Sequence, residues 1–177
     1  MPDRQTLAET EKAMSAHVSD LSLNFPAAAA VSSLYRAANA VRLYLTNSVL
    51  RKHGLTWTGF VVLWVVWIWD GLETRRAAEN AAISKATLTG VVKTLEARGL
   101  ITRRVSDTDR RLVNLELTPA GATLMKELYP VFNAAEAEVV AGLSPRKLSD
   151  LTSSLRSIVT ELEAKPDALM TEATLVE

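Results

Sequence analysis

Lysine and threonine side chains recur along one face of a short helix that the sequence predicts over residues 84–98. The apolar side chains of this stretch follow the i, i+3, i+4, i+7 spacing of a buried helical face: Leu88, Val91, Val92 and Leu95. The opposite face carries small side chains and two lysines but no acid: Lys85, Ala86, Thr89, Gly90 and Lys93. Ammonium and hydroxyl groups in this arrangement can bind phosphates and base edges, so the chemistry they indicate is nucleic-acid recognition.

Capping residues and a β-hairpin flank this helix. Ser84 is a good N-cap because its hydroxyl can accept from a free amide of the first turn, and Gly99 suits a left-handed C-terminal cap. Residues 100–105 and 112–117 are the expected strands, joined by the turn-forming sequence Ser-Asp-Thr-Asp-Arg-Arg. Alternation in the second strand places three residues on an apolar face: Val113, Leu115 and Leu117. A helix exposing lysines, followed by a hairpin with arginines at its tip, is the pattern of a winged helix.

The charge of the chain is concentrated in this region. The 177 residues contain 20 basic and 20 acidic side chains, whereas residues 84–111 contain seven basic and three acidic ones. The segment therefore carries +4 and the remainder −4. Duplex DNA carries about one negative charge per 1.7 Å of its axis, so a local basic patch matters more than the total. Charge alone also fits a solvated surface, and the helix and hairpin favour nucleic acid.

Other classes of function find little support. The chain has no cysteine, which excludes disulfides, thiolate metal sites and thiol redox sensing. It also lacks Gly-x-Ser-x-Gly, His-Glu-x-x-His and a phosphate-binding glycine loop, so we expect neither an enzyme nor a bound cofactor or metal. Asp107 and Asp109 resemble a turn more than a metal site. The longest apolar run, residues 60–69, is about half the ~20 residues of a membrane span, and no secretory signal is visible, so we expect a soluble cytoplasmic protein.

Three stretches carry a resemblance to a known family: LTWTGFVVL (55–63), ISKATLTGVVKTLEARGLITRR (83–104) and SDTDRRLVNLELTPAG (106–121). The last contains an Asp-x-Arg tip followed by Leu-x-Leu-Thr-x-x-Gly. In this order they resemble the DNA-binding half of the multiple-antibiotic-resistance regulator (MarR) family of bacterial repressors, and the likeness spans roughly residues 28–162. The resemblance implies a mainly α fold with a small β wing, a homodimer with interlocked terminal helices, and a small, often phenolic or anionic, effector ligand.

The remaining elements follow from helix signals and from this resemblance. Residues 55–69 have a cap at Thr56 but are β-branched and aromatic; locally they could form a buried strand, and the cap and the resemblance favour a buried helix. Residues 72–74 are expected to add a short strand and residues 75–81 the first helix of the helix-turn-helix. The turn is Ala82-Ile83, where alanine implies either a turn without positive φ or mild strain. The expected organisation is 1–24 N-terminal extension, 25–54 dimerisation helix, 55–117 winged helix-turn-helix domain, 118–163 dimerisation helices and 164–177 tail.

The long helices outside the winged part carry apolar stripes that it cannot fully cover. The helix after Phe25-Pro26 is expected to reach His53-Gly54, with a stripe of Val31, Leu34, Ala38, Val41, Leu45 and Val49. The helix after Thr118-Pro119 is expected to carry a stripe of Leu124, Leu128, Val131 and Phe132, and to kink or divide at Pro130. The last helix, from Ser144-Pro145, has a stripe of Leu148, Leu151, Leu155, Ile158 and Leu162. These stripes predict a helical dimerisation region, and the alternative is a compact monomeric bundle. Residues 1–24 are either partly helical or a disordered tail.

The DNA contacts are expected from the helix 84–98 in the major groove and from the wing. In the helix they are Ser84, Lys85, Ala86, Thr87, Thr89, Gly90 and Lys93. Gly90 would allow close approach to the duplex, or else serves helix packing. Arg103 and Arg104 would contact phosphates or acids of the body. At the tip Arg110 would enter the minor groove, with Asp109 or Asp107 holding it and Arg111. The operator is expected to be pseudo-palindromic, with half-sites ~34–36 Å apart.

The effector site is expected between the dimerisation and DNA-binding parts, as the resemblance implies. Its candidate lining is Arg42, His53, Trp57 and Trp64, although each tryptophan could instead belong to the core. A different class of function also stays open, namely a winged-helix module whose basic face binds an acidic protein partner. Salt-dependent binding to a palindromic duplex would separate the two.

Overall fold

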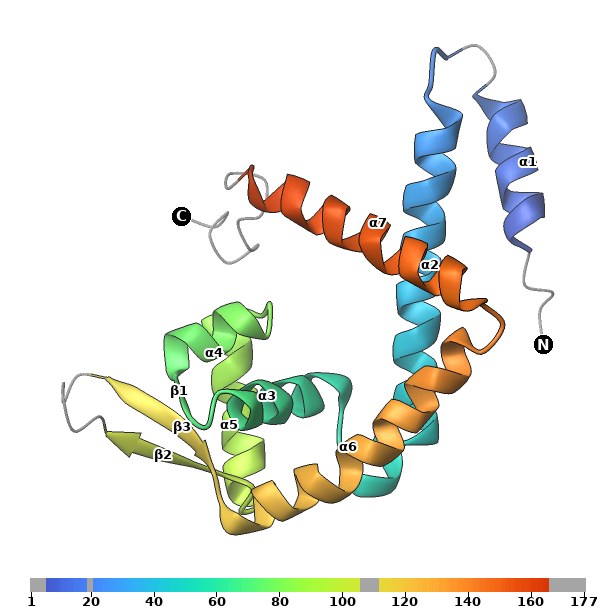
Figure 1. The fold of residues 1–177 in the computed structure, drawn as a ribbon. Helices are drawn as coiled ribbons and strands as arrows, with labels where there is room; N and C mark the ends of the chain where they lie inside the picture. The colour runs from blue at the N-terminus through green and yellow to red at the C-terminus, as the bar shows by residue number, and fades with distance from the viewer. Residues whose placement is uncertain (1–5, 19–20, 106–111, 166–177) are drawn as a thin grey trace. The chain divides into compact units, whose positions relative to one another are not determined.

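The helices and strands of the winged part are present in the computed structural model, which describes residues 6–18, 21–105 and 112–165 (Figure 1). The elements in chain order are α1 (Leu7–His17), α2 (Phe25–Ser48), the 3-10 helix η1 (Leu50–His53), α3 (Trp57–Ile68), β1 (Leu72–Glu73), α4 (Thr74–Asn80), α5 (Lys85–Ala97), β2 (Ile101–Val105), β3 (Val113–Leu117), α6 (Pro119–Val140) and α7 (Pro145–Glu163). The chain divides into two compact units, Met1–Tyr44 and Leu45–Glu177.

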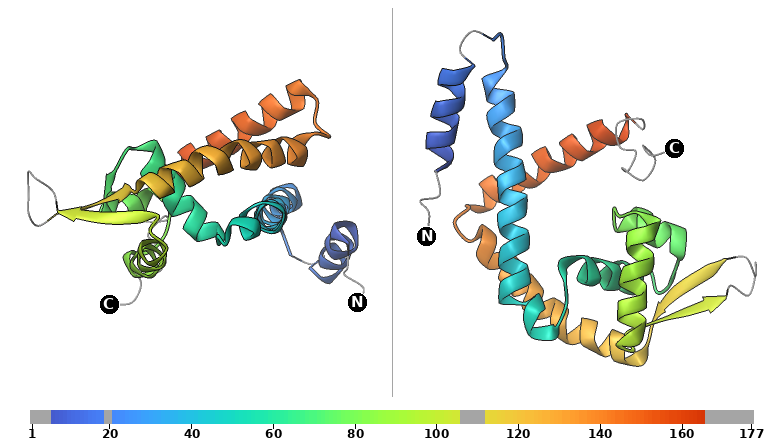
Figure 2. Two further views of the ribbon diagram at one scale, coloured as in Figure 1. Left: turned by 90° about the horizontal axis from the view of Figure 1, so that it is seen from below. Right: turned by 180° about the vertical axis from the view of Figure 1, so that it is seen from behind.

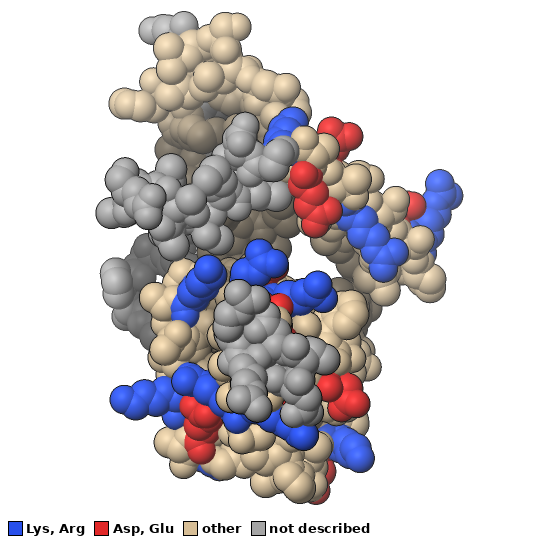
Figure 3. Space-filling view, turned by 90° about the vertical axis from the view of Figure 1, so that its left-hand side faces the viewer, with Lys and Arg blue, Asp and Glu red and all other residues tan. Residues whose placement is uncertain are grey.

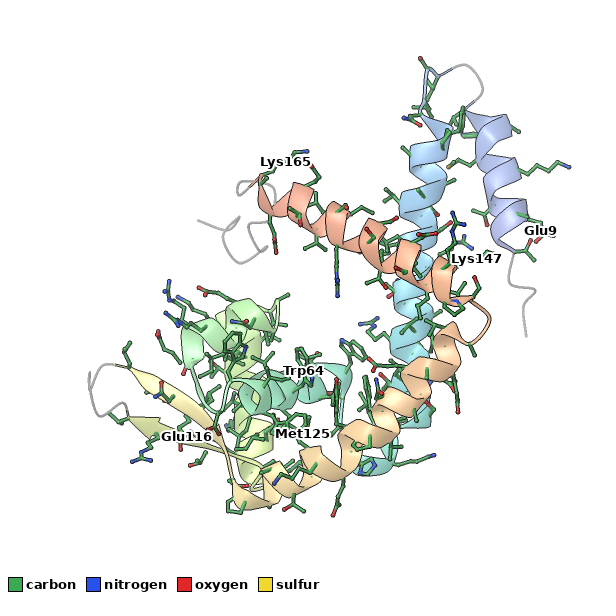
Figure 4. The ribbon with its side chains drawn as sticks, in the orientation of Figure 1. Glu9, Trp64, Glu116, Met125, Lys147 and Lys165 are labelled. Atoms are coloured by element: carbon green, nitrogen blue, oxygen red, sulfur yellow. The ribbon has the colours of Figure 1, made fainter. Side chains whose placement is uncertain are left out.

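The first unit contains α1 and most of α2. A capping box starts α1: the Glu9 amide donates to the Thr6 hydroxyl at 3.2 Å, and the Thr6 amide donates to the Glu9 carboxylate at 2.7 Å (Glu9 is labelled in Figure 4). Hydrogen bonds from the Thr6 amide and hydroxyl lower the pKa of Glu9. Arg36 on α2 donates to the Thr10 hydroxyl at 3.2 Å. The helical alternative for residues 1–24 is therefore correct over α1.

The winged part belongs to the second unit. Its sheet is antiparallel with the order β1-β3-β2, and Leu115 in the central strand pairs with Leu72 on one side and Arg103 on the other. Leu115 is fully buried while its strand neighbours are half-buried. The hairpin β2–β3 projects from the helices α3, α4 and α5 (Figure 2). The predicted hairpin is confirmed, and the short strand predicted at residues 72–74 is present as Leu72–Glu73, with Thr74 already in α4.

The ambiguous apolar segment is the helix α3. The Thr56 hydroxyl accepts from the Gly59 amide at 3.0 Å and starts it. α3 contacts α4, α5, α6 and β3, so most of its circumference is covered, which explains why its sequence lacks a polar face. Phe60 stacks on Phe132 of α6 with ring centroids 4.2 Å apart, and Met125 on the same helix is fully buried (labelled in Figure 4). The expectation of a buried helix is confirmed.

The ends and faces of two long helices differ from the expectation. α2 ends at Ser48, and the separate turn η1 continues to His53 before Gly54 takes a left-handed φ of 62°. α6 continues through Pro130 as one helix. Its buried residues are Gly121, Met125, Leu128, Phe132 and Ala135, whereas of the predicted stripe Leu124 is half-buried and Val131 is 53% exposed. The buried face steps 4, 3, 4, 3 along the helix, and Val131 lies outside it.

The last helix keeps its apolar stripe exposed. Within the second unit no residue of α7 is buried among the described residues, although the stripe is the one that the sequence predicts. Exposed members of it are Leu148, Leu151, Ile158 and Leu162. Across the residues that the structure describes, no helix is both long and apolar enough to cross a membrane.

Candidate nucleic-acid interface

The helix α5 is fixed by its cap and its buried face. The Ser84 hydroxyl accepts from the Thr87 amide at 3.1 Å, which satisfies a donor of the first turn. Leu88, Val92 and Leu95 are fully buried, and Val91, predicted on the same face, is only half-buried. Gly99 follows the helix with φ 68°, as predicted. Because this face of α5 is packed into the core, the opposite face of the helix must point away from the core.

That opposite face is exposed as the sequence predicts. The exposed candidates are Lys85, Ala86, Thr87, Thr89, Gly90 and Lys93, while Ser84 is half-buried at the cap. The Thr89 hydroxyl donates to the Lys85 carbonyl at 2.9 Å, so toward a ligand it offers an acceptor. The face presents two cations, two hydroxyl oxygens and small side chains, which suits the wall of a DNA groove.

Gly90 has open space beside it. Among the described residues, no heavy atom beyond its chain neighbours and the adjacent backbone of its own helix lies within 4 Å of the position that a Cβ would take, and the backbone needs no positive φ there. The helix-packing alternative therefore finds no neighbour in the described part of this chain.

The turn before α5 is strained. Ala82 has φ 51°, in the left-handed region that costs a non-glycine residue roughly 1–2 kcal/mol. Of the two alternatives for this alanine, strain is the one observed. Ala77 and Ala78 on α4 are buried, and the Ile83 amide donates to the Ala78 carbonyl at 3.1 Å. The short turn thus sets α4 and α5 closely against each other.

Strand β2 supplies the basic part of the wing that the structure describes. Arg103 forms an ion pair with Glu96 on α5, at 3.4 Å, so it contacts an acid of the body. Arg104 is exposed on the same strand. Figure 3 shows Lys and Arg side chains gathering on the face of the molecule that holds the wing. Four candidates of the wing tip lie outside the described residues: Asp107, Asp109, Arg110 and Arg111.

Arg98 is a structural residue that the sequence reasoning counted only as a charge. From the C-cap of α5 it donates to the carbonyl oxygens of His53 and Gly54, at 2.8 and 2.7 Å. These oxygens lie 44 and 45 positions earlier in the chain. No local sequence signal could have identified the two partners.

The Leu-Thr-Pro-x-Gly motif joins the wing to α6. The Thr118 amide donates to the Leu100 carbonyl at 3.1 Å, and its hydroxyl donates to the Gly99 carbonyl at 2.6 Å. The same hydroxyl accepts from the Gly121 amide at 3.0 Å and so caps α6. A Cβ on Gly121 would overlap the Leu100 carbonyl oxygen. Threonine and glycine are therefore required here by backbone contacts.

The four effector candidates are divided between the two units. Arg42 lies in the first unit, exposed, and donates to the Asn39 side chain at 3.3 Å. His53, Trp57 and Trp64 lie in the second unit and are half-buried. The Trp57 ring centroid is 6.3 Å from that of Phe132, so this tryptophan takes part in the core. No group of three or more His, Cys, Asp and Glu residues that could hold a metal occurs among the described residues.

Comparisons with known proteins agree with this geometry. The model of the MarR family matches residues 55–113. The uncharacterized HTH-type transcriptional regulator YwaE of Bacillus subtilis (strain 168) is 38% identical over 141 residues, which cover 80% of this chain and 82% of YwaE.

The chain is also similar to two solved structures. Bordetella bronchiseptica BpsR, whose DNA binding is regulated by 6-hydroxynicotinic acid, matches with TM-score 0.67 and 27% identity over 73% of this chain and 98% of its own. AbsC, a MarR family transcriptional regulator from Streptomyces coelicolor, shares the fold with TM-score 0.70 and 22% identity, over 76% of this chain and 93% of its own. The helix-turn-helix, the wing and a likeness covering four fifths of the sequence together show that the chain belongs to the MarR family of transcriptional regulators.

Proposed function

We propose that this protein is a homodimeric repressor that binds a pseudo-palindromic DNA operator and is released by a small aromatic or anionic ligand. The observation that carries the proposal is the exposed face of α5, which bears Lys85 and Lys93 but no acid and lies opposite the fully buried side chains of Leu88, Val92 and Leu95. Such a face can enter the major groove, where cations and hydroxyls meet phosphates and base edges. Arg104 on β2 and Arg110 at the wing tip extend the contact.

Exposed apolar surface supports the homodimer. The stripe of α7 and several large apolar side chains of α2 are exposed within their own units, for example Val31, Tyr35 and Leu43. Contiguous apolar surface on a chain of this kind marks an interaction site, and a two-fold dimer is the commonest way to cover it. A compact monomeric bundle would instead bury the stripe of α7. Two copies of α5 would then face two half-sites of one operator.

The relation to BpsR supports a small-molecule effector. BpsR is regulated in its DNA binding by 6-hydroxynicotinic acid, an aromatic carboxylate. We extend this class of ligand to the present chain, with His53, Trp57 and Trp64 of the second unit as candidate lining. A tryptophan can stack on an aromatic ring. The effector would act by preferring the form of the dimer that does not bind DNA.

The test is fluorescence anisotropy with a labelled duplex from upstream of the protein's own gene, compared with a scrambled duplex over a series of salt concentrations. We expect saturable binding of one dimer per site, at least two orders of magnitude tighter to the cognate duplex. The same assay then serves to screen aromatic carboxylates for release. Equal and weak binding to both duplexes would refute the proposal and direct attention to acidic protein partners of the basic face.

Single lysine variants assign the contacts of α5. If Lys85 or Lys93 contacts a base, its replacement by alanine weakens cognate binding alone; if it contacts a phosphate, binding to all duplexes weakens and the salt slope falls by about one unit. The matched control is Lys126→Ala, because Lys126 is an exposed lysine of α6 outside the proposed interface. Unchanged binding by both α5 variants would show that this face does not contact DNA.

A further inference from the structure

One guanidinium connects the C-terminal end of α5 to the turn before α3. Arg98 donates from Nη1 to the Gly54 carbonyl at 2.7 Å and from Nη2 to the His53 carbonyl at 2.8 Å. We call these two hydrogen bonds the Arg98 bridge. All three residues belong to the second unit, and His53 ends η1, the turn that follows α2 in the chain. The bridge therefore ties the proposed groove-reading helix to the segment where the long N-terminal helix ends.

The turn is shaped so that these two carbonyls receive the arginine. The amide of Gly54 donates to Arg51 and the amide of Leu55 donates to Leu50, both at 3.0 Å. With φ 62°, Gly54 reverses the chain and brings its own carbonyl to Arg98. The guanidinium lies over the glycine, with Nη2 3.6 Å from the position of a Cβ. A planar fork with fixed donors can bond both oxygens at once, which an ammonium group cannot reproduce.

We infer that Arg98 is a positioning residue that sets which separation of the two operator half-sites the dimer accepts. The inference rests on the proposed function. In a dimer that reads two half-sites, the separation of the two copies of α5 must match the operator. If η1 moved relative to α5, each copy of α5 would shift with respect to the end of α2, the helix that precedes η1. The Arg98 bridge opposes that movement because it joins the two segments directly.

A phosphate contact is the rival role for an exposed arginine on a DNA-binding protein, and the two roles differ in measurable ways. A phosphate contact contributes charge, so its loss weakens binding at every spacing and flattens the salt slope by about one unit. A positioning bond contributes geometry, so its loss reduces the preference for one spacing and leaves the slope unchanged. Lysine would replace arginine at a phosphate but not in the bridge.

The experiment measures binding of the full-length protein to the cognate duplex and to duplexes with one base pair added or removed between the half-sites. One base pair turns a half-site by about a tenth of a turn, so the wild type should lose at least about tenfold in affinity. For Arg98→Met and Arg98→Lys we expect cognate affinity about tenfold weaker, a smaller loss on changing the spacing, and an unchanged salt slope. Arg51→Met, which removes a charge from the same turn, should keep the wild-type spacing preference.

Hydrogen exchange without DNA gives a second measurement on the same variants. Amides of residues 50–56 should exchange faster in Arg98→Lys than in the wild type, because the lysine cannot hold both carbonyls. Wild-type spacing preference in both Arg98 variants, unchanged exchange, or a flatter slope that lysine restores would each overturn the inference. Absence of cognate binding by the wild type would instead refute the proposed function, so the two failures are distinguishable.

Discussion

Gly90→Ala should raise the stability of the protein while it weakens DNA binding. Glycine inside a helix costs about 0.8–1.0 kcal/mol relative to alanine, and Gly90 lies in the sixth position of the 13-residue helix α5. The new methyl group would meet no described atom within 4 Å, so no packing penalty offsets this gain. The free energy of unfolding should therefore rise by about 1 kcal/mol, which for a chain of this length raises Tm by roughly 2–4 °C.

The same methyl group should interfere with the duplex. If α5 approaches the groove closely at Gly90, the extra carbon overpacks a fitted contact, for which a cost of about 1–3 kcal/mol is typical. Cognate affinity should then fall roughly 5- to 150-fold. Thermal unfolding followed by circular dichroism gives the stability, and fluorescence anisotropy with the cognate duplex gives the affinity. A higher stability together with a weaker affinity for the duplex would indicate that Gly90 serves contact with DNA and not the stability of the fold.

Gly142→Ala is the matched control for this variant. Gly142 also has open space in the described part of the chain, but it lies between α6 and α7, outside the proposed interface. We expect its replacement to leave cognate affinity unchanged. Wild-type affinity in Gly90→Ala would refute the close approach of α5 at this position. A fall in stability would refute the open environment of Gly90.

Three further substitutions test other features of the winged part. Gly121→Ala should lower the free energy of unfolding by about 3 kcal/mol, because its Cβ would overlap the Leu100 carbonyl oxygen and disturb the bond from the Thr118 amide; urea unfolding measures this, and a wild-type midpoint would contradict the contact. Ala82→Gly should stabilise the fold by roughly 1 kcal/mol by relieving a φ of 51°, again measured by urea unfolding, and a loss of stability would show that the turn is unstrained. Arg110→Ala should weaken operator binding and flatten the salt slope by about one unit in a titration over salt concentration, whereas unchanged binding would remove the wing tip from the interface.

Short-range patterns were sufficient for the helix α5 and the hairpin after it. The cap at Ser84, the buried spacing of Leu88, Val92 and Leu95, and the left-handed Gly99 all depend on neighbours within a few positions. The same holds for the caps of α3, α6 and α7. Such signals are readable because each element forms its own hydrogen bonds from adjacent residues. The exposed face of α5 followed as the complement of its buried face.

Where two local readings competed, periodicity alone did not decide between them. The apolar run of α3 fitted a strand as well as a helix, and only the Thr56 cap and the family resemblance favoured the helix. Tertiary contact with α4, α5, α6 and β3 is what allows a helix without a polar face. Ala82 fitted a relaxed turn, yet the close packing of α4 on α5 holds it at positive φ. Val131 satisfied the apolar spacing of α6, but the part of that helix facing α3 excludes it.

The sequence by itself determined the fold class, the basic wing and which face of α5 is exposed, since all of these follow from the order of residue types along the chain. Only the tertiary structure revealed the Arg98 bridge and the contact of Gly121 with Leu100. Both join segments separated by about 20 to 45 positions. Contacts over that distance depend on how the packed elements meet in the tertiary structure. The periodicity and the caps within one segment carry no information about which backbone atoms of the other segment will lie beside it.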